Sequence, residues 1–134
     1  MLPFAVKKLL FYAYRKGMTR MFGCPFCQIA SHEKPAKIVF EDEQCLALQD
    51  IHPQAPVHIL VIPRKHISSL NDDLKEDEQL LGHLLAVAGR IAKFSGIDDT
   101  GFRTVINTNA EAGQTVFHLH IHVLGGRIMR WPPG

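Results

Sequence analysis

The sequence predicts an α+β fold, in which one long helix and a short N-terminal helix pack against a five-stranded antiparallel sheet. Three observations predict it. The 134 residues are 46% hydrophobic and 21% charged, which is ordinary for one globular domain with a sizeable core. Five short apolar segments are bounded by turn residues, as strands are. One longer segment repeats its apolar residues at spacings of three and four, as an amphipathic helix does.

The expected strands are short, and each ends at a turn signal. They are residues 36–42, 44–50, 57–63, 102–108 and 116–124. An acidic turn at residues 41–43 joins the first two, and a loop containing Pro53 and Pro56 precedes the third. The short helix is expected near residues 27–31.

The long helix is expected over residues 71–95. Acidic residues 76–78 lie in its first turns, and Arg90 and Lys93 lie near its end, as the helix dipole favours. Gly96 suits the position just past its C-terminus. The apolar stripe expected to face the sheet is Leu81, Leu84, Leu85, Ala88, Ile91 and Ala92.

The N-terminus differs in charge from the rest, so the chain divides into a basic leader, residues 1–21, and one domain, residues 22–134. Five basic residues and no acidic residue occur within the first 32 positions. The leader could be an organelle transit peptide, a basic amphipathic segment that seeks surfaces, or a disordered tail upstream of a start at Met18 or Met21.

The number of cysteines and the length of the apolar segments limit the cellular compartments in which we expect the protein. Three cysteines are an odd number, which disfavours a secreted disulfide scaffold and favours a reducing compartment. No apolar run is long enough to cross a bilayer. We therefore expect a cytoplasmic protein, or an organellar one such as mitochondrial if the leader is a transit peptide, with no nucleic-acid partner and no stable membrane insertion.

The segment QTVFHLHIHVLGG, residues 114–126, carries the strongest chemical signal. In an extended strand, the alternate residues His118, His120 and His122 share one face, and residues 117, 119, 121 and 123 face the core. One metal ion does not comfortably take all three, because the first and last would be about 13 Å apart. A neutral imidazole instead attacks phosphorus well near neutral pH, and flanking imidazoles can stabilise the phosphoryl oxygens and supply a proton.

The loop before the histidines, NTNAEAGQT at residues 107–115, reads as an anion cradle. Asn107, the flexible Gly113, and the amides and side chains of Gln114 and Thr115 can surround a phosphate. Together the loop and the histidines predict nucleotidyl or phosphoryl transfer.

Several separated motifs resemble the histidine triad family, and most closely its nucleotide-binding protein branch. They are HLHIHVLGG with NTNAEAGQT before it, DIHPQAPVHILVIPRKHI at residues 50–67, and the terminal WPPG. The resemblance covers residues 22–134. It implies a symmetric homodimer whose two five-stranded sheets join into one. It also implies purine nucleoside monophosphates as ligands, and hydrolysis of phosphoramidate or acyl-adenylate bonds at the α-phosphate, with no cofactor required for catalysis.

By motif position, the resemblance assigns roles to individual residues. His120 would be the nucleophile that becomes covalently nucleotidylated, flanked by His118 and His122, with His58 supporting the triad. The implied substrate-binding residues are Asp50 at the ribose hydroxyls, Ile51 beside the base, the phosphate-side residues Asn107, Gly113, Gln114 and Thr115, His122 at the phosphate, and Trp131 in a tail that reaches toward the partner's active site.

Three positions depart from the family pattern without removing a catalytic group. His52 stands where serine is usual, Ala112 where glycine is common, and Thr115 where serine is usual. The other functions that we weighed are a nucleotide-binding regulatory or scaffold protein, a dinucleoside polyphosphate hydrolase, and an enzyme that uses the triad as metal ligands.

A structural zinc site is a further expectation from the family. Cys24 and Cys27 form a Cys-x-x-Cys pair, and related triad proteins join such a pair to two histidines around zinc. The equivalents here would be His66 and His118. A Cys₂His₂ set is a reasonable tetrahedral zinc site that would tie the N-terminal segment to the sheet. The alternative is a reduced pair of thiols with no ion.

Overall fold

Five strands form one antiparallel sheet in the order β1-β2-β3-β5-β4, which confirms the predicted fold class. The structure is a computed structural model that describes residues 23–134, so the expectation for the leader, residues 1–21, lies outside the described residues. The strands are β1 (Ile38–Glu41), β2 (Cys45–Gln49), β3 (Val57–Pro63), β4 (Phe102–Val105) and β5 (Ile121–Gly125). The helices are α2 (Pro25–Ala30), α3 (Glu78–Phe94) and the 3₁₀ turn η1 (Ala110–Ala112).

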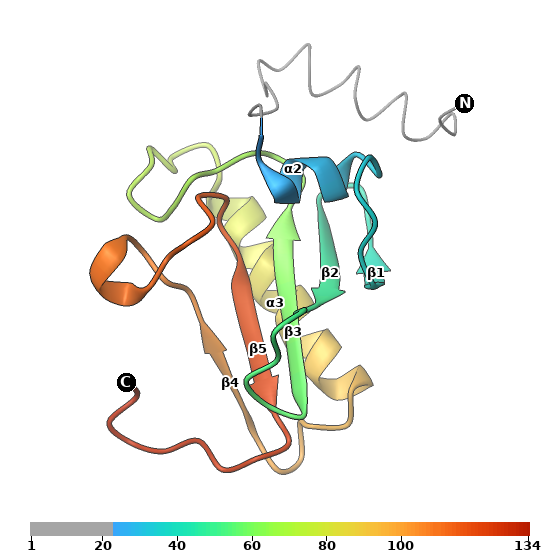
Figure 1. Ribbon diagram of the computed structural model, residues 1–134, viewed down its shortest axis with the longest axis vertical. Helices are drawn as coiled ribbons and strands as arrows, with labels where there is room; N and C mark the ends of the chain where they lie inside the picture. Colours follow the sequence, from blue (N-terminus) through green and yellow to red (C-terminus); the bar gives the residue numbers. More distant parts are fainter. Residues whose placement is uncertain (1–22) are drawn as a thin grey trace.

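The two faces of the sheet are covered by different helices. Helix α3 runs behind the sheet, and α2 lies at the end of the sheet where β3 finishes (Figure 1). Alternate residues of β3 therefore enter two cores. Ile59 and Val61 pack in the α3 core, whereas Leu60 and Ile62 pack in the α2 core. His58 is in phase with Leu60, so its side chain belongs to the α2 face.

Strand β5 is shorter than the expected segment 116–124 and begins only at Ile121. The ladder pairs Val61 with Ile121, so the next pairs would place Leu119 opposite Pro63. Proline has no N–H to give to a ladder. Its carbonyl is also taken, by His118 Nε2 at 2.8 Å, and Leu119 N–H bonds instead to Ile67 O. His118 and His120 therefore leave the sheet, and the prediction that all three histidines share a strand face is wrong.

Helix α3 starts at Glu78, later than the expected residue 71. The acidic side chains before it satisfy local backbone groups, which offers the chain an alternative to helix. Asp72 accepts from Ser68 N–H, and Asp73 accepts from Lys75 N–H. The buried Asp77 carboxylate binds the Lys65 ammonium at 2.7 Å. This loop is thereby fixed to the end of β3.

The buried face of α3 follows most of the expected stripe, and Leu81 packs partly buried against the same core. Leu84, Ala88, Ile91 and Ala92 are buried as expected, together with Val87. Leu85, in contrast, is 52% exposed and points away from the sheet. Within residues 23–134, no helix combines the length and apolar character that a membrane span requires.

Candidate functional site

On the α2 face, histidines, cysteines and an aspartate form two groups. His120 lies between them in the sequence, after His118 of one group and before His122 of the other. One group is Asp50, His58 and His122, and the other is Cys24, Cys27, His66 and His118. The strands explain the first group, because β3 and β5 pair His58 with Leu124 and Leu60 with His122. His58 and His122 thus lie diagonally on one face.

In the first group, His58 is the central residue. Its Nε2 lies 2.8 Å from His122 Nδ1 and 3.4 Å from Asp50 Oδ2. Its Nδ1 accepts the Gln54 N–H at 3.0 Å. A backbone N–H can only donate, so the neutral His58 ring carries its proton on Nε2. That proton is donated to His122 Nδ1, which leaves the proton of neutral His122 on its own Nε2.

The same reasoning fixes the tautomer of His120. Its Nδ1 lies 2.7 Å from the main-chain oxygen of His118, which can only accept. Nδ1 therefore donates, and in the neutral ring Nε2 keeps its lone pair. The ring lies 4.9 Å from that of His122, centroid to centroid. The site thus presents a nucleophilic nitrogen on His120 beside a proton donor on His122.

Burial keeps the neighbouring imidazoles neutral. It lowers the pKa of His122 to about 4, with the help of His120 and His58 and against the attraction of Asp50. Burial also lowers the pKa of His58, again against Asp50. Both rings are therefore uncharged at neutral pH, which is the state that the hydrogen bond between them requires.

The second group, which we call the Cys–His cluster, gathers four soft donor atoms in one place. Cys24 Sγ lies 3.3 Å from His118 Nδ1, and Cys27 Sγ lies 3.3 Å from His66 Nδ1 and 3.5 Å from His118 Nδ1. The two Nδ1 atoms are 3.2 Å apart. All four donors lie within 4.8 Å of one another.

The donors of the Cys–His cluster fit a tetrahedral zinc ion. Bonds of about 2.3 Å to sulfur and 2.0–2.1 Å to nitrogen place ligand atoms roughly 3.3–3.8 Å apart, close to the separations found. The tautomer also fits, because His118 Nε2 must donate to the Pro63 carbonyl, which leaves Nδ1 free as a ligand. Burial lowers the pKa of His118 to about 4, so that the ring is neutral. The first group fits a metal less well, since the facing nitrogen of His58 bears the proton.

The loop before the histidines contains the 3₁₀ turn η1 and ends that turn at Gly113, and its glutamine side chain is already engaged. Gly113 is left-handed, at φ +80°. The Gln114 side chain is buried. It accepts the Asn109 N–H at 2.9 Å and donates to Ser68 O at 2.8 Å. Thr115 is exposed and Asn107 half-buried.

Two expected binding residues are largely exposed. Ile51 is 85% exposed just after Asp50, and Trp131 is 81% exposed in the C-terminal tail. One Asp50 oxygen, Oδ1, accepts the His52 N–H at 2.7 Å, and Oδ2 faces His58.

The α3 side of the sheet carries a separate polar group, Asp42, Cys45 and His83. The Asp42 carboxylate accepts from His83 Nε2 at 2.6 Å and from Cys45 N–H at 2.8 Å. Burial, together with Asp42, raises the pKa of the Cys45 thiol to about 12, so it stays protonated. This group joins the turn between β1 and β2 to helix α3.

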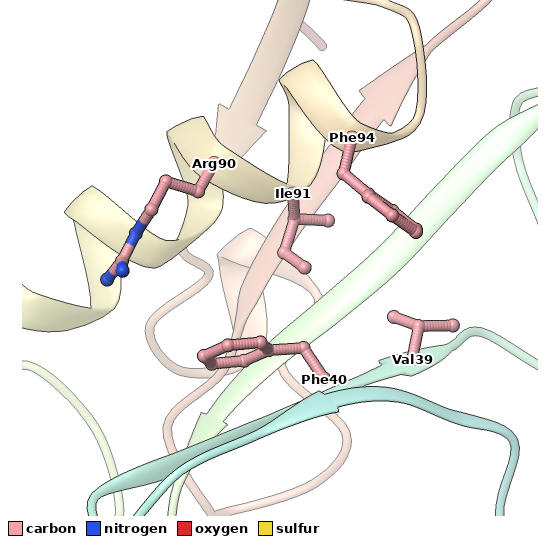
Figure 2. A pocket seen from close by; sticks show the side chains of 5 residues that line it. All are labelled: Val39, Phe40, Arg90, Ile91 and Phe94. Atoms are coloured by element: carbon pink, nitrogen blue, oxygen red, sulfur yellow. The ribbon is translucent and has the colours of Figure 1, made fainter.

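A pocket on this side is lined by Val39, Phe40, Arg90, Ile91 and Phe94, between β1 and α3 (Figure 2). Its lining is apolar apart from the Arg90 guanidinium. No nucleophile and no carboxylate lines it, so the histidine face is the better candidate for chemistry.

Sequence reasoning missed three groups that hold the histidines. The Gln54 N–H and the Pro63 carbonyl set the tautomers of His58 and His118, and main-chain groups leave no signal in side-chain identity. Phe26 packs edge-on against His118 at 5.8 Å and against His120 at 5.2 Å, centroid to centroid. Its position inside the Cys-x-x-Cys pair was the available signal.

Comparisons with known proteins agree with this geometry. Residues 31–129 match the HIT domain. An uncharacterized HIT-like protein of Synechocystis is 56% identical over 109 residues, which cover 81% of this chain and 95% of that protein.

Solved structures give the same result. A HIT family hydrolase from Legionella pneumophila has a TM-score of 0.82 and 50% identity, covering 84% of this chain and 100% of that chain. A zinc-bound histidine triad family protein from Mycobacterium smegmatis has a TM-score of 0.67 and 36% identity, covering 78% of this chain and 76% of that one. With the matched domain and these relatives, the chain belongs to the HIT family and has the fold of its hydrolases.

Proposed function

We propose that this protein is a hydrolase of the histidine triad nucleotide-binding branch, which cleaves purine nucleoside 5′-phosphoramidates, and acyl-adenylates, through a covalent nucleotidyl-His120 intermediate. One observation carries the proposal. His120 Nδ1 is held by the His118 carbonyl at 2.7 Å, so Nε2 is free for attack. The neutral His58–His122 pair stands beside it as a source of protons.

The proposed reaction has two steps. In the first, His120 Nε2 forms a bond to phosphorus while the bond from phosphorus to the amine breaks. The departing amine takes the proton on His122 Nε2, and the negative charge left on the His58–His122 pair lies beside the positive charge of the nucleotidylated His120 ring. In the second step, the oxygen of a water molecule forms a bond to phosphorus while the bond from phosphorus to His120 Nε2 breaks. AMP or GMP leaves, and a proton of that water returns to the pair. His120 Nδ1 keeps its hydrogen bond to His118 throughout, which steadies the positive charge of the nucleotidylated ring.

The nucleotide would lie across the end of β2 and the loop before His118. Asp50 Oδ2 is the oxygen that would accept from the ribose hydroxyls, because Oδ1 already accepts from His52. The exposed Ile51 would cover the base. Asn107, Gly113, Gln114 and Thr115 would surround the phosphate; the Thr115 hydroxyl and the main chain would do so directly, since the Gln114 side chain holds the loop.

We also propose that the Cys–His cluster holds zinc. Cys24, Cys27, His66 and His118 would be its four ligands. The ion would supply a structural cross-link between α2 and the end of β3, and the reaction itself would run on the protein's imidazoles. The zinc-bound relative from Mycobacterium smegmatis supports this proposal.

Turnover of adenosine 5′-phosphoramidate by wild type and His120→Asn tests the proposed function. We expect the variant to lose a thousandfold or more of the rate, roughly the cost of removing a nucleophile, with an unchanged circular dichroism spectrum. His32→Asn is the matched control, because the His32 side chain pairs with Glu41 rather than with a histidine of the site, and its positive φ suits asparagine. A wild-type rate in His120→Asn would overturn the proposal.

A further inference from the structure

We propose that the Cys–His cluster controls the nucleophile: a thiophilic divalent cation bound there fixes the position of His120, and its loss slows nucleotidyl transfer while leaving nucleotide binding intact. This inference rests on the proposed function, because it concerns how the attacking imidazole is held. It assigns the cluster a role beyond the folding of the N-terminal segment.

The first link from the cluster to the nucleophile runs through the main chain of His118. The His118 ring is fully buried, with Nδ1 among the cluster donors and Nε2 bonded to Pro63 O at 2.8 Å. The carbonyl of the same residue accepts from His120 Nδ1 at 2.7 Å. Leu119 N–H bonds to Ile67 O, next to the other histidine of the cluster. An ion that locks His118 therefore also locks the acceptor that orients His120.

The second link runs through helix α2. This helix has six residues, too few to be stable alone, so tertiary contacts must hold it in place. Its cap is Cys24, whose Sγ accepts the Cys27 N–H at 3.3 Å. Between the two cysteines, Phe26 packs edge-on against the rings of both His118 and His120. A cation bound by both thiolates would hold Phe26 of α2 against the ring of His120.

Without an ion, the apolar α2 core still holds the helix on the sheet, but the polar contacts between the Cys–His cluster donors are weak. Thiols are poor hydrogen-bond donors and acceptors, and His118 Nδ1 has no proton of its own to donate. We expect α2 to separate more often from His118 and His120 in the metal-free protein. The attacking nitrogen then spends less time aligned, and misplacement of about 1 Å can cost two orders of magnitude in rate. Asp50 and the loop at residues 107–115 are not cluster ligands, so binding of a nucleotide should change little.

The test starts from the whole wild-type chain, freed of metal by a chelator under reducing conditions and then reloaded with Zn²⁺ or Co²⁺. Cobalt should give the visible bands of a tetrahedral thiolate site at one ion per chain. Calorimetry should give an AMP dissociation constant within threefold between the metal-free and loaded forms. The single-turnover rate of nucleotidylation by an adenosine phosphoramidate should fall at least tenfold in the metal-free form and recover on reloading.

A readout independent of activity follows the orientation of His120. With ¹⁵N-labelled histidine, the Nδ1–H signal of His120 should be slow to exchange with water in the loaded protein. In the metal-free form it should broaden or exchange faster, because the His118 acceptor is no longer fixed.

Two variants of one ligand separate metal loss from damage to the chain. His66→Ala should lose the ion and the rate together, whereas His66→Cys keeps four donors in a Cys₃His set, so it should bind the ion and recover at least part of the rate that His66→Ala loses. Cys45→Ala is the matched control, because it removes another buried thiol, on the α3 side of the sheet, and should keep ion and rate.

The outcomes separate this inference from the proposed function. Equal single-turnover rates and equal His120 exchange in metal-free and loaded protein would overturn the inference and leave the proposed function standing. Failure to bind one cobalt ion per chain in the wild type, or loss of AMP binding together with the metal, would also overturn it. Absence of nucleotidylation from the loaded wild type would instead contradict the proposed function.

Discussion

At the scale of the residue, the chemistry of this site follows from which ring nitrogen carries each proton. Three main-chain groups decide it: the Gln54 N–H, the His118 carbonyl and the Pro63 carbonyl. A backbone N–H only donates and a carbonyl only accepts, so each contact permits one tautomer. The result is a lone pair on His120 and a proton on His122, which is the division of roles that nucleophilic attack requires.

The lowered pKa of His122 predicts a loss of stability in acid. In the unfolded chain a histidine titrates near 6.5, whereas burial lowers the folded pKa of His122 to about 4. Between these values the unfolded state binds more protons, so stability is full above pH 6.5 and is lost as the pH falls toward 4. We expect wild type to lose about 1–2 kcal/mol more than His122→Asn between pH 7.5 and 5 in urea unfolding. The same pH dependence in both proteins would contradict this assignment.

The sequence singled out the candidate residues of the site, but it did not reveal their surroundings. The alternation of His118, His120 and His122 singled out the histidines, and the Cys24–Cys27 spacing singled out the metal donors. The four donors of the Cys–His cluster do lie together. The tautomers, however, depend on main-chain partners that side-chain spacing does not reveal, and one of them, Pro63 for His118, is far away along the chain.

At the scale of the element, the departures from the predicted boundaries have local causes. Period-two alternation predicted a strand through all three histidines, but Pro63 ends the ladder at Val61 and Ile121. The acidic run before Glu78 was expected inside the helix, but Asp72 and Asp73 bond to nearby backbone groups. The existence and order of the elements followed from the sequence pattern, whereas their ends depended on the backbone hydrogen bonds available near each end.

The close approach of β5 to the chain after α3 gives a stability prediction for Gly125→Ala. A Cβ at Gly125 would lie 2.5 Å from Ile97 Cδ1 and 2.9 Å from Ile97 Cβ. Ile97 is buried in the α3 core, so it cannot easily move aside. We expect destabilisation by about 1–3 kcal/mol, the usual cost of overpacking, measured by urea unfolding.

Gly89→Ala is the matched control for that substitution. Gly89 lies within α3 with no atom near its added Cβ, so alanine should stabilise the protein by up to about 1 kcal/mol. Equal effects of the two substitutions would contradict the account of the Gly125 contact.

At the scale of the whole molecule, the two faces of the sheet differ: one carries the larger core, and the other carries the candidate site. Helix α3 closes one face with the larger core, and the other face holds α2, the Cys–His cluster and the catalytic candidates. The two sheet edges also differ. Strand β4 is an edge strand with Phe102 38% exposed, and β1 is the other edge, with Phe94 of α3 nearby and 83% exposed (Figure 2).

Among residues 23–134, β4 pairs only with β5, so its outer edge could carry the homodimer that the family resemblance implies, in which two sheets would join. We expect wild type to have twice the mass of the chain in light scattering. Phe102→Lys should dissociate the dimer, since lysine on an edge strand blocks pairing between strands. Phe94→Lys, an exposed phenylalanine by the opposite edge, should stay dimeric. Dissociation by Phe94→Lys alone, or a monomeric wild type, would contradict an interface at β4.

The most direct measurement of the central claim is to trap and locate the covalent intermediate. Wild type is mixed with a slow adenosine phosphoramidate, quenched in alkaline denaturant, digested and sequenced by mass spectrometry. The account predicts one adenylyl group per modified chain, on the imidazole of His120, and none in His120→Asn. An adenylyl group on another residue, or product release by the wild type without any adduct at His120, would contradict it.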